Sequence, residues 1–360
     1  MASHSSTPKN PTPPGGQLSR RDALRVLGAA GAAMLASAPR LGAAEGGTNA
    51  PARGPAPSLA GAQAGFYRFH IGKFQALALN EGGIRGPIDQ PVWAGASAAT
   101  MKADLAAAGM PVTTIELPFT VLLVRLGAEL VLIDAGSGPL FGSTAGLLPA
   151  SLATAGVPPG EITAIILTHG HSDHFGGLLD AATKEPAFPH ARLFVRRREY
   201  DYWTSMDPDV SQMLIPADNA RGLFPRAREI LGRFKDQWQF VEPGDKPLDG
   251  LEIIDAAGHT PGQIGVLISS GSDQLLHFAD VAHHHAVSFA HPDWAYLFDS
   301  QPQLATATRR RLLDRAAAER LRLFGSHMPF PGLGRVRVAG DHYEHVLEPW
   351  SSVPENPTPA

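Results

Sequence analysis

The chain has 360 residues, enough to bury a large hydrophobic core in one or two domains. Its 30 basic and 34 acidic side chains leave a formal net charge of −4 and form no basic stripe of the kind that binds nucleic acid. The sequence contains no cysteine, which excludes disulfide bonds, thiolate zinc sites and iron–sulfur clusters.

Residues 1–44 have the composition of an export segment. A stretch rich in Ser, Thr, Pro and Gly leads to Arg20 and Arg21, and an apolar run follows at residues 26–38. This arrangement resembles a twin-arginine export signal, which implies delivery to the periplasm by the twin-arginine machinery. The apolar run is too short for a permanent anchor, so we expect a mature form without one. An amphipathic first helix is the alternative, which the lack of polar alternation disfavours.

The rest of the chain divides into a linker, one domain and a tail. Residues 45–65 are rich in Gly, Ala and Pro, which predicts a flexible linker. Without residues 1–44 the chain holds 25 basic and 33 acidic side chains, a net charge of about −8. This charge argues against nucleic acid as a partner. We expect a single folded domain over residues 66–350, followed by a tail at residues 351–360.

The predicted elements form two successive blocks of strands, each followed by a helix. The pattern predicts an α/β (αββα) fold, in which two mixed β-sheets pack face to face with helices outside. Strands are predicted at residues 66–79 and 120–133 as two hairpins, and at 162–167, 192–195, 251–254, 264–269 and 274–278. Helices are predicted at residues 144–156, 199–203, 226–234 and 305–320.

Residues 168–174 contain several potential metal-binding side chains close together in the sequence. They read Thr-His-Gly-His-Ser-Asp-His and directly follow the apolar strand at residues 162–167. Three imidazoles and a carboxylate at this spacing fit a tight loop after a strand better than one helix face. Neutral imidazole and carboxylate are ligands of zinc and other divalent ions. The stretch therefore predicts a metal site, with a surface loop that happens to be rich in His as the alternative.

Further His and Asp residues stand just after other predicted strands. Asp134 ends an apolar strand in the sequence Val-Leu-Ile-Asp-Ala-Gly, and His259 lies in Gly-His-Thr-Pro-Gly. Asp280 and His327 also follow apolar segments. Together with residues 168–174, these motifs occur in the order found in the metallo-β-lactamase superfamily. The chain resembles that superfamily from Phe66 to Val346.

The resemblance implies a centre for two divalent metal ions, with Zn²⁺ as the expected metal and Mn²⁺, Co²⁺ or Fe²⁺ as alternatives. It implies that Asp280 bridges the ions as the catalytic carboxylate and that a metal-bridging hydroxide is the nucleophile. Asp134 would orient the ligands from behind, or would only cap a turn. The implied ligands are His169, His171 and His259 for the first ion, and Asp173, His174 and His327 for the second, with Asp280 shared.

Four further segments carry a closer resemblance, at residues 66–74, 138–142, 199–203 and 326–334. They look like segments of the exported methyl parathion hydrolases, which are dinuclear zinc phosphotriesterases thought to be related to lactonases. This resemblance implies hydrolysis of small neutral esters, chiefly organophosphate triesters, by a homodimer. It also implies a substrate pocket lined by Phe141, Trp203 and Phe224, with an ordinary core position as the alternative for each.

Other functions stay open on the sequence. A lactonase or aryl esterase with promiscuous phosphotriesterase activity is the main alternative. A glyoxalase-like thioesterase or a β-lactamase is less favoured, because no cationic residue stands out as a clamp for a carboxylate. A metal-binding or nucleic-acid-processing member of the superfamily is disfavoured by the acidic charge. His283, His284 and His285 are compatible with a third metal site, with support for the ligands or with a pocket rim.

Overall fold

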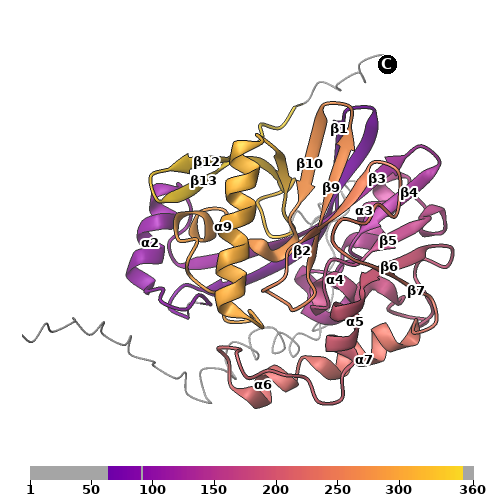
Figure 1. Cartoon of the computed structure of the whole chain (residues 1–360), viewed down its shortest axis with the longest axis horizontal. Coiled ribbons are helices and arrows are strands. Elements are labelled where there is room, and N and C mark those ends of the chain that lie inside the picture. The colour runs from indigo at the N-terminus through magenta and orange to yellow at the C-terminus, as the bar shows by residue number, and fades with distance from the viewer. Residues whose placement is uncertain (1–63, 91, 352–360) are drawn as a thin grey trace, which may run out of the picture.

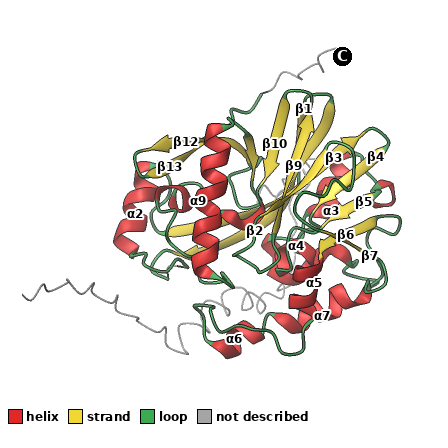
Figure 2. Cartoon of the chain, in the orientation of Figure 1, coloured by secondary structure: helices red, strands yellow, loops and turns green. Residues whose placement is uncertain are grey.

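The structure, a computed structural model, describes residues 64–90 and 92–351. The predicted export signal, most of the linker and most of the tail therefore lie outside the described residues. The described chain forms two β-sheets packed face to face, with helices on both outer sides (Figure 1). Figure 2 shows the strands in the middle of the molecule and the helices around them. The predicted αββα sandwich is confirmed.

The first sheet has seven strands that lie in chain order. β1 to β4 pair antiparallel and β4 to β7 pair parallel. Gly72 has a φ of +53° in the turn between the first two strands, a conformation that glycine adopts without steric cost. The strands are β1 (Phe66–Ile71), β2 (Phe74–Pro87), β3 (Thr114–Leu126), β4 (Glu129–Ile133), β5 (Ala164–Ile166), β6 (Arg192–Arg196) and β7 (Trp238–Val241).

The second sheet has six strands in the order β13-β12-β11-β10-β9-β8. Its neighbours pair antiparallel except β10 and β11, which run parallel. Both sheets are therefore mixed, as the sequence predicts. The strands are β8 (Leu251–Asp255), β9 (Ile264–Ser270), β10 (Asp273–His277), β11 (Arg322–Phe324), β12 (Leu333–Ala339) and β13 (His342–Leu347).

Helices cover the outer faces of the sheets. In Figure 1, α9 and α2 lie on one side of the molecule, and α5 and α7 lie on the other. No helix within the described ranges is both long and apolar enough to cross a bilayer. The α-helices are α2 (Ala98–Ala107), α3 (Leu148–Ala155), α4 (Ser172–Phe175), α5 (Arg197–Thr204), α6 (Ala217–Arg221), α7 (Phe224–Arg233), α8 (Val287–Ala290) and α9 (Pro302–Ala318). The 3₁₀ turns are η1 (Gly138–Thr144), η2 (Pro159–Glu161), η3 (Gly176–Leu178) and η4 (Ala279–Val281).

The apolar core lies in layers on both faces of each sheet. Ile166 of β5 packs between the sheets in one cluster with Ile253 of β8. The adjacent Ile165 points to the opposite face, where it joins Leu231 of α7 in a second cluster. Leu312 of α9 belongs to a third cluster on the outer face of the second sheet. This alternation buries both faces of β5, which explains its continuous apolar sequence.

Sequence patterns locate the strongly apolar elements and miss the weaker ones. The helix predicted at residues 144–156 begins only at Leu148, since Gly142 has a φ of +73° and interrupts the preceding 3₁₀ turn. The helices and strands without a matching prediction are α2, α4, α6, α8, β7, β11, β12 and β13. The last two strands leave several side chains exposed or half-buried, so their hydrophobic alternation is weak.

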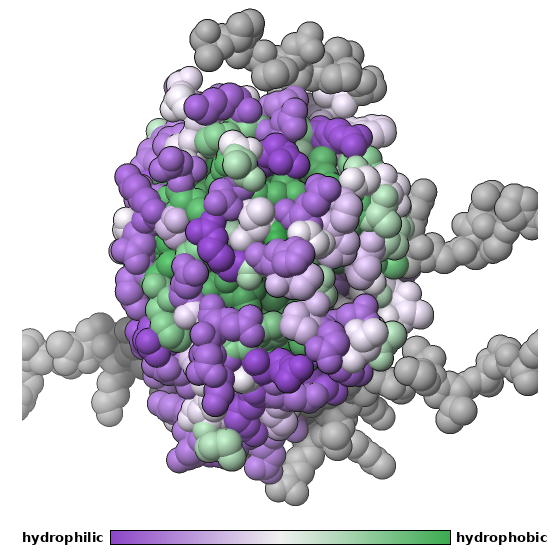
Figure 3. Space-filling model, turned by 90° about the vertical axis from the view of Figure 1, so that its right-hand side faces the viewer, coloured by the Kyte–Doolittle hydropathy of each residue, from purple (hydrophilic) through white to green (hydrophobic). Residues whose placement is uncertain are grey.

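The surface is mainly polar on the face shown in Figure 3. Hydrophilic side chains cover most of that face, and apolar ones show between them. Among the described residues, the most exposed large apolar side chains are Met206 and Trp350, which are 83% and 76% exposed. The apolar residues therefore serve mainly to build the interior.

Candidate metal centre

Loops that follow the ends of β5, β8, β10 and β11 bring the candidate ligands together. Each loop leaves a buried strand, so the backbone that carries the ligands is anchored at one end in the core. The ligand atoms within each group lie within 4.8 Å of one another. Among the described residues, the first group consists of His169, His171 and His259, and the second of Asp173, His174, Asp280 and His327.

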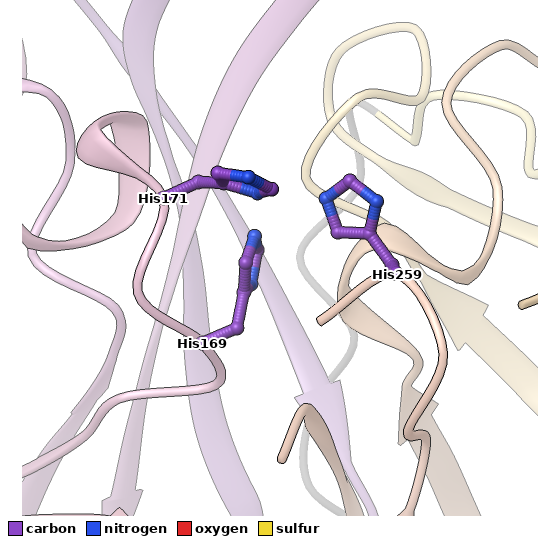
Figure 4. A group of neighbouring side chains, drawn as sticks. All are labelled: His169, His171 and His259. Atoms are coloured by element: carbon purple, nitrogen blue, oxygen red, sulfur yellow. The ribbon is translucent and has the colours of Figure 1, made fainter. Parts of the chain in front are cut away.

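The three imidazoles of the first group face a common point, as Figure 4 shows. His169 and His171 come from the loop after β5, and His259 reaches them from the loop after β8. The ring centroids of His169 and His171 are 5.0 Å apart, and those of His171 and His259 are 4.6 Å apart. This arrangement suits one divalent ion held by three nitrogen atoms.

Asp280 lies between the two groups. Its Oδ2 atom is 3.7 Å from His169 Nε2 and 3.6 Å from His259 Nε2. On the side of the second group, Oδ1 is 3.4 Å from His174 Nε2, and Oδ2 is 2.8 Å from His327 Nε2. One carboxylate therefore faces ligands from both groups, so it could serve as a ligand of an ion held by either group.

The unpartnered atoms of the centre are those that a divalent ion would bind. The Nε2 atoms of His169, His171, His174 and His259 are buried without a hydrogen-bond partner among the described residues, and so is Oδ1 of Asp280. Buried polar atoms are normally satisfied, so this convergence of free ligand atoms indicates a missing common partner. A small cavity of about 10 Å³ beside the second group is roughly the size of one water. Imidazole and carboxylate together fit zinc or another divalent ion.

Asp134 holds the second group from behind. Its side chain accepts hydrogen bonds from the backbone N–H of Thr168 (2.7 Å) and from the Thr168 hydroxyl (2.9 Å). It also lies 2.8 Å from Nδ1 of His174, which leaves Nε2 of that ring toward the centre. Asp134 has a φ of +65°, a left-handed conformation uncommon outside glycine. The residue thus contacts a ligand ring as well as capping a turn.

Two more imidazoles are oriented through their Nδ1 atoms. Nδ1 of His259 lies 2.8 Å from the buried carboxylate of Asp299, which also accepts the backbone N–H of Tyr296. Nδ1 of His327 donates to the carbonyl oxygen of Pro118 at 2.9 Å. Sequence reasoning missed Asp299, since no local motif distinguishes it from other loop aspartates.

Glu199 joins the two loops of the first group. This fully buried carboxylate accepts hydrogen bonds from the backbone N–H groups of Gly170 and Gly262, both at 2.8 Å. A third bond, of 2.7 Å, comes from the indole Nε1 of Trp203. Gly170 lies between two ligands of the loop after β5, and Gly262 lies three residues after His259. Glu199 therefore fixes the spacing between the two loops.

The sequence analysis did not identify Glu199 as a supporting residue, although the helical spacing around it gives a signal. Glu199 and Trp203 are four residues apart on α5, so they lie on the same helix face, which is the buried one. Gly170 also has a steric role, since a Cβ at this position would lie 2.2 Å from the indole ring of Trp203. A carboxylate on the apolar face of a helix indicates a buried partner.

The two groups differ in electrostatics. Burial and the neighbouring imidazoles hold the pKa of His169 and His171 well below the usual range, and burial lowers the pKa of His259 to about 4. Burial also acts on His174, but the nearby carboxylates, Asp280 foremost, outweigh it and raise the pKa of His174 well above its usual value. The first group is therefore neutral imidazole, the form that binds a metal ion.

The predicted pocket aromatics lie at different depths. Phe141 is half-buried and packs edge-to-face on Phe119 with centroids 5.1 Å apart, and Phe119 in turn contacts the His327 ring at 5.5 Å. Trp203 is 1% exposed, and Phe224 is fully buried and stacked on it at 4.6 Å. Phe141 thus belongs to an aromatic wall beside the second group, whereas Trp203 and Phe224 occupy core positions behind the first.

The fold and the site agree with a known family. Residues 116–327 match the family model of the metallo-beta-lactamase superfamily. The match covers more than half of the chain. The chain belongs to this superfamily, and its site has the side chains of a metal-dependent hydrolase.

Two solved structures resemble the chain over nearly their whole length. The dizinc quorum-quenching lactonase AidC, in complex with a product, is 29% identical with a TM-score of 0.75, and the match covers 80% of this chain and 99% of AidC. The hydrolase AbOPH of the beta-lactamase superfamily is 25% identical with a TM-score of 0.73, and the match covers 81% of this chain and 99% of AbOPH.

Curated relatives match over shorter segments. Metallo-beta-lactamase domain-containing protein 1 of Xenopus laevis is 31% identical over 122 residues, which are 34% of this chain and 38% of the relative. A probable metallo-hydrolase of Mycobacterium tuberculosis is 27% identical over 235 residues, which are 55% of this chain and 67% of the relative. The chain thus spans little more than a third of the length of the first of these relatives.

Proposed function

We propose that the protein is a dinuclear metal-dependent hydrolase of neutral esters, with lactones as its main substrates. The observation that carries the proposal is the pair of adjoining ligand groups that share Asp280. A structural metal site needs only one ion and a closed ligand set, whereas two groups joined by one carboxylate suit a reactive centre.

The charges of the site suit the hydrolysis of an ester. Two bound divalent ions would supply positive charge and Lewis acidity at this position. Asp173 and Asp280 offset only part of a charge of +4, so the site would stay positive and favour a transition state that gains negative charge. Asp134, Glu199 and Asp299 keep the ligands in place, so the geometry is set before a substrate binds.

Similarity and local chemistry support lactones as substrates. AidC is a dizinc lactonase and is similar to this chain along almost its whole length. Phe119 and Phe141 form an apolar surface beside the second group, which suits an uncharged substrate better than an anionic one.

Organophosphate triesters are the second candidate substrates. The resemblance to methyl parathion hydrolases, which includes Phe141 and the segment after His327, supports this candidate. A triester is neutral and gains negative charge in its transition state, so the same positive site would serve it.

The remaining features of this function are proposals drawn from the sequence. We propose zinc as the native metal because of the imidazole-rich ligand set. Export to the periplasm is proposed from the paired arginines and the apolar run at residues 26–38, and a homodimer is proposed from the family resemblance alone.

Side-by-side assays test the proposed function. The purified chain, loaded with zinc or manganese, would be assayed on N-hexanoyl homoserine lactone, paraoxon and a β-lactam. We expect kcat/KM to be highest for the lactone, and turnover to disappear after chelation and return with added metal. A higher kcat/KM for paraoxon would favour the second candidate. Lack of turnover on all three substrates would overturn the proposal.

A further inference from the structure

His283 is a buried imidazole to which neither the family motifs nor the proposed function assigns a role. It lies three residues after Asp280 and is 1% exposed. Neither of its ring nitrogen atoms has a hydrogen-bond partner among the described residues. A fully buried imidazole with two unsatisfied nitrogen atoms is unusual and points to a partner that is not a protein side chain.

The ring of His283 is held in one orientation. It stacks on Tyr296 with centroids 3.8 Å apart and an interplanar angle of 16°. Its backbone N–H donates to the hydroxyl of Ser288 at 3.2 Å, and the buried Arg309 of α9 donates to the carbonyl of Val281 two residues earlier. These contacts hold both the backbone and the ring of His283, so the fold sets the direction in which its ring nitrogen atoms point.

That direction is toward the metal centre. Nε2 of His283 lies 3.5 Å from Oδ2 of Asp280, and the ring centroid lies 4.6 Å from that of His259. The ligand atoms of His259, Asp280 and His283 all lie within 4.8 Å of one another. A contact of 3.5 Å is longer than a good hydrogen bond, which spans about 2.7–3.2 Å, but it is a normal separation for two atoms that share an ion.

We propose that His283 is an additional ligand, through Nε2, of the ion that His259 holds. With Asp280, it would give the first ion two protein ligands beyond the three imidazoles of its group. More protein ligands leave fewer positions for solvent. The first ion would therefore be held more tightly than the second and would exchange more slowly.

The competing role for His283 is a hydrogen bond that positions Asp280. Glutamine separates the two roles, since its amide can donate a hydrogen bond but is a poor zinc ligand. Leucine removes both functions while filling similar space. His285 gives a matched control, because it is a neighbouring, half-buried imidazole that belongs to neither ligand group.

The experiment measures metal binding rather than turnover and rests on the two-ion centre of the proposed function. Chelator-treated wild type, His283→Leu, His283→Gln and His285→Leu would be titrated with Zn²⁺ by calorimetry and with Co²⁺ by visible absorption. We expect both His283 variants to bind one of the two ions about tenfold or more weakly, with the other unchanged. Their Co²⁺ absorption should intensify as the coordination number falls, and His285→Leu should match the wild type.

The other outcomes are distinct. Wild-type affinity in His283→Gln but not in His283→Leu would overturn the proposal in favour of a hydrogen-bond role. Unchanged binding in both variants, with two ions in the wild type, would overturn the inference and leave the proposed function intact. A wild type that binds no ion would overturn both. Circular dichroism of the metal-free variants verifies that each is folded.

Discussion

The two ligand groups lie side by side but are built from different chemistry. The first consists of imidazoles alone, and the second combines two imidazoles with Asp173 and Asp280. His259 and His327 are equally buried, yet the pKa of His259 falls to about 4 whereas the pKa of His327 rises. Burial lowers the pKa of both rings, but at His327 the carboxylates of Asp280 and Asp173 outweigh that effect.

The groups also differ in how the fold supports them. Asp134 contacts a ring of the second group directly, through Nδ1 of His174. Glu199 contacts no ring of the first group and instead binds the backbone N–H groups of Gly170 and Gly262. The second group is therefore oriented through its side chains, while the first also depends on the spacing between two loops.

We expect the largest loss of metal and activity when a ligand residue itself is replaced, and the loss should differ between Asp280, which both groups share, and His169, which belongs to one group. Replacement of Asp280 by Ala should weaken both ions, whereas His169→Ala should remove only the first. Both variants should lose activity by more than about 100-fold, because even loss of a partner of a ligand weakens metal binding about 10- to 100-fold. Metal analysis of the purified variants, together with kcat/KM, measures this difference. Retention of two ions per chain in either variant would contradict the assignment of ligands.

A smaller effect tests the two kinds of support. Glu199→Gln places an amide N–H₂ where only donors face the side chain, so it should disturb the loops and weaken the first ion about 10- to 100-fold. Asp134→Asn is the matched change and should weaken the second ion instead. Calorimetric titration with Zn²⁺ measures both. If both variants weakened the same ion, Glu199 and Asp134 would not each support a different ligand group.

The smallest effect is a difference in protonation within the metal-free chain. His174 and His327 have raised pKa values, so they should keep their protons to a higher pH than an ordinary histidine does. His259 has a lowered pKa and should stay neutral until the pH falls to about 4. NMR titration of histidine-labelled protein, with single His variants for assignment, follows each ring. Titration of all of them near the usual value of about 6.5 would remove the contrast between the groups.

The residue types of the candidate ligands and their positions after apolar strands can be read from the sequence. Apolar runs such as residues 162–167 identify buried strands, and the polar residues that follow must emerge at a sheet edge. The residues at 168–174 are close in sequence, so their proximity in space needed no knowledge of the fold. Among the elements that the sequence missed, β13 has side chains that are mostly only partly buried or exposed.

The grouping of the ligands and the residues that support them depend on long-range packing. His259 and Asp299 are 40 residues apart, and Gly262 and Glu199 are 63 apart, so no local pattern joins them. The structure also placed Phe224 in the core, a distinction that depends on packing and not on residue type. Long-range contacts arise from the stacking of the two sheets, which brings distant strand ends to one edge.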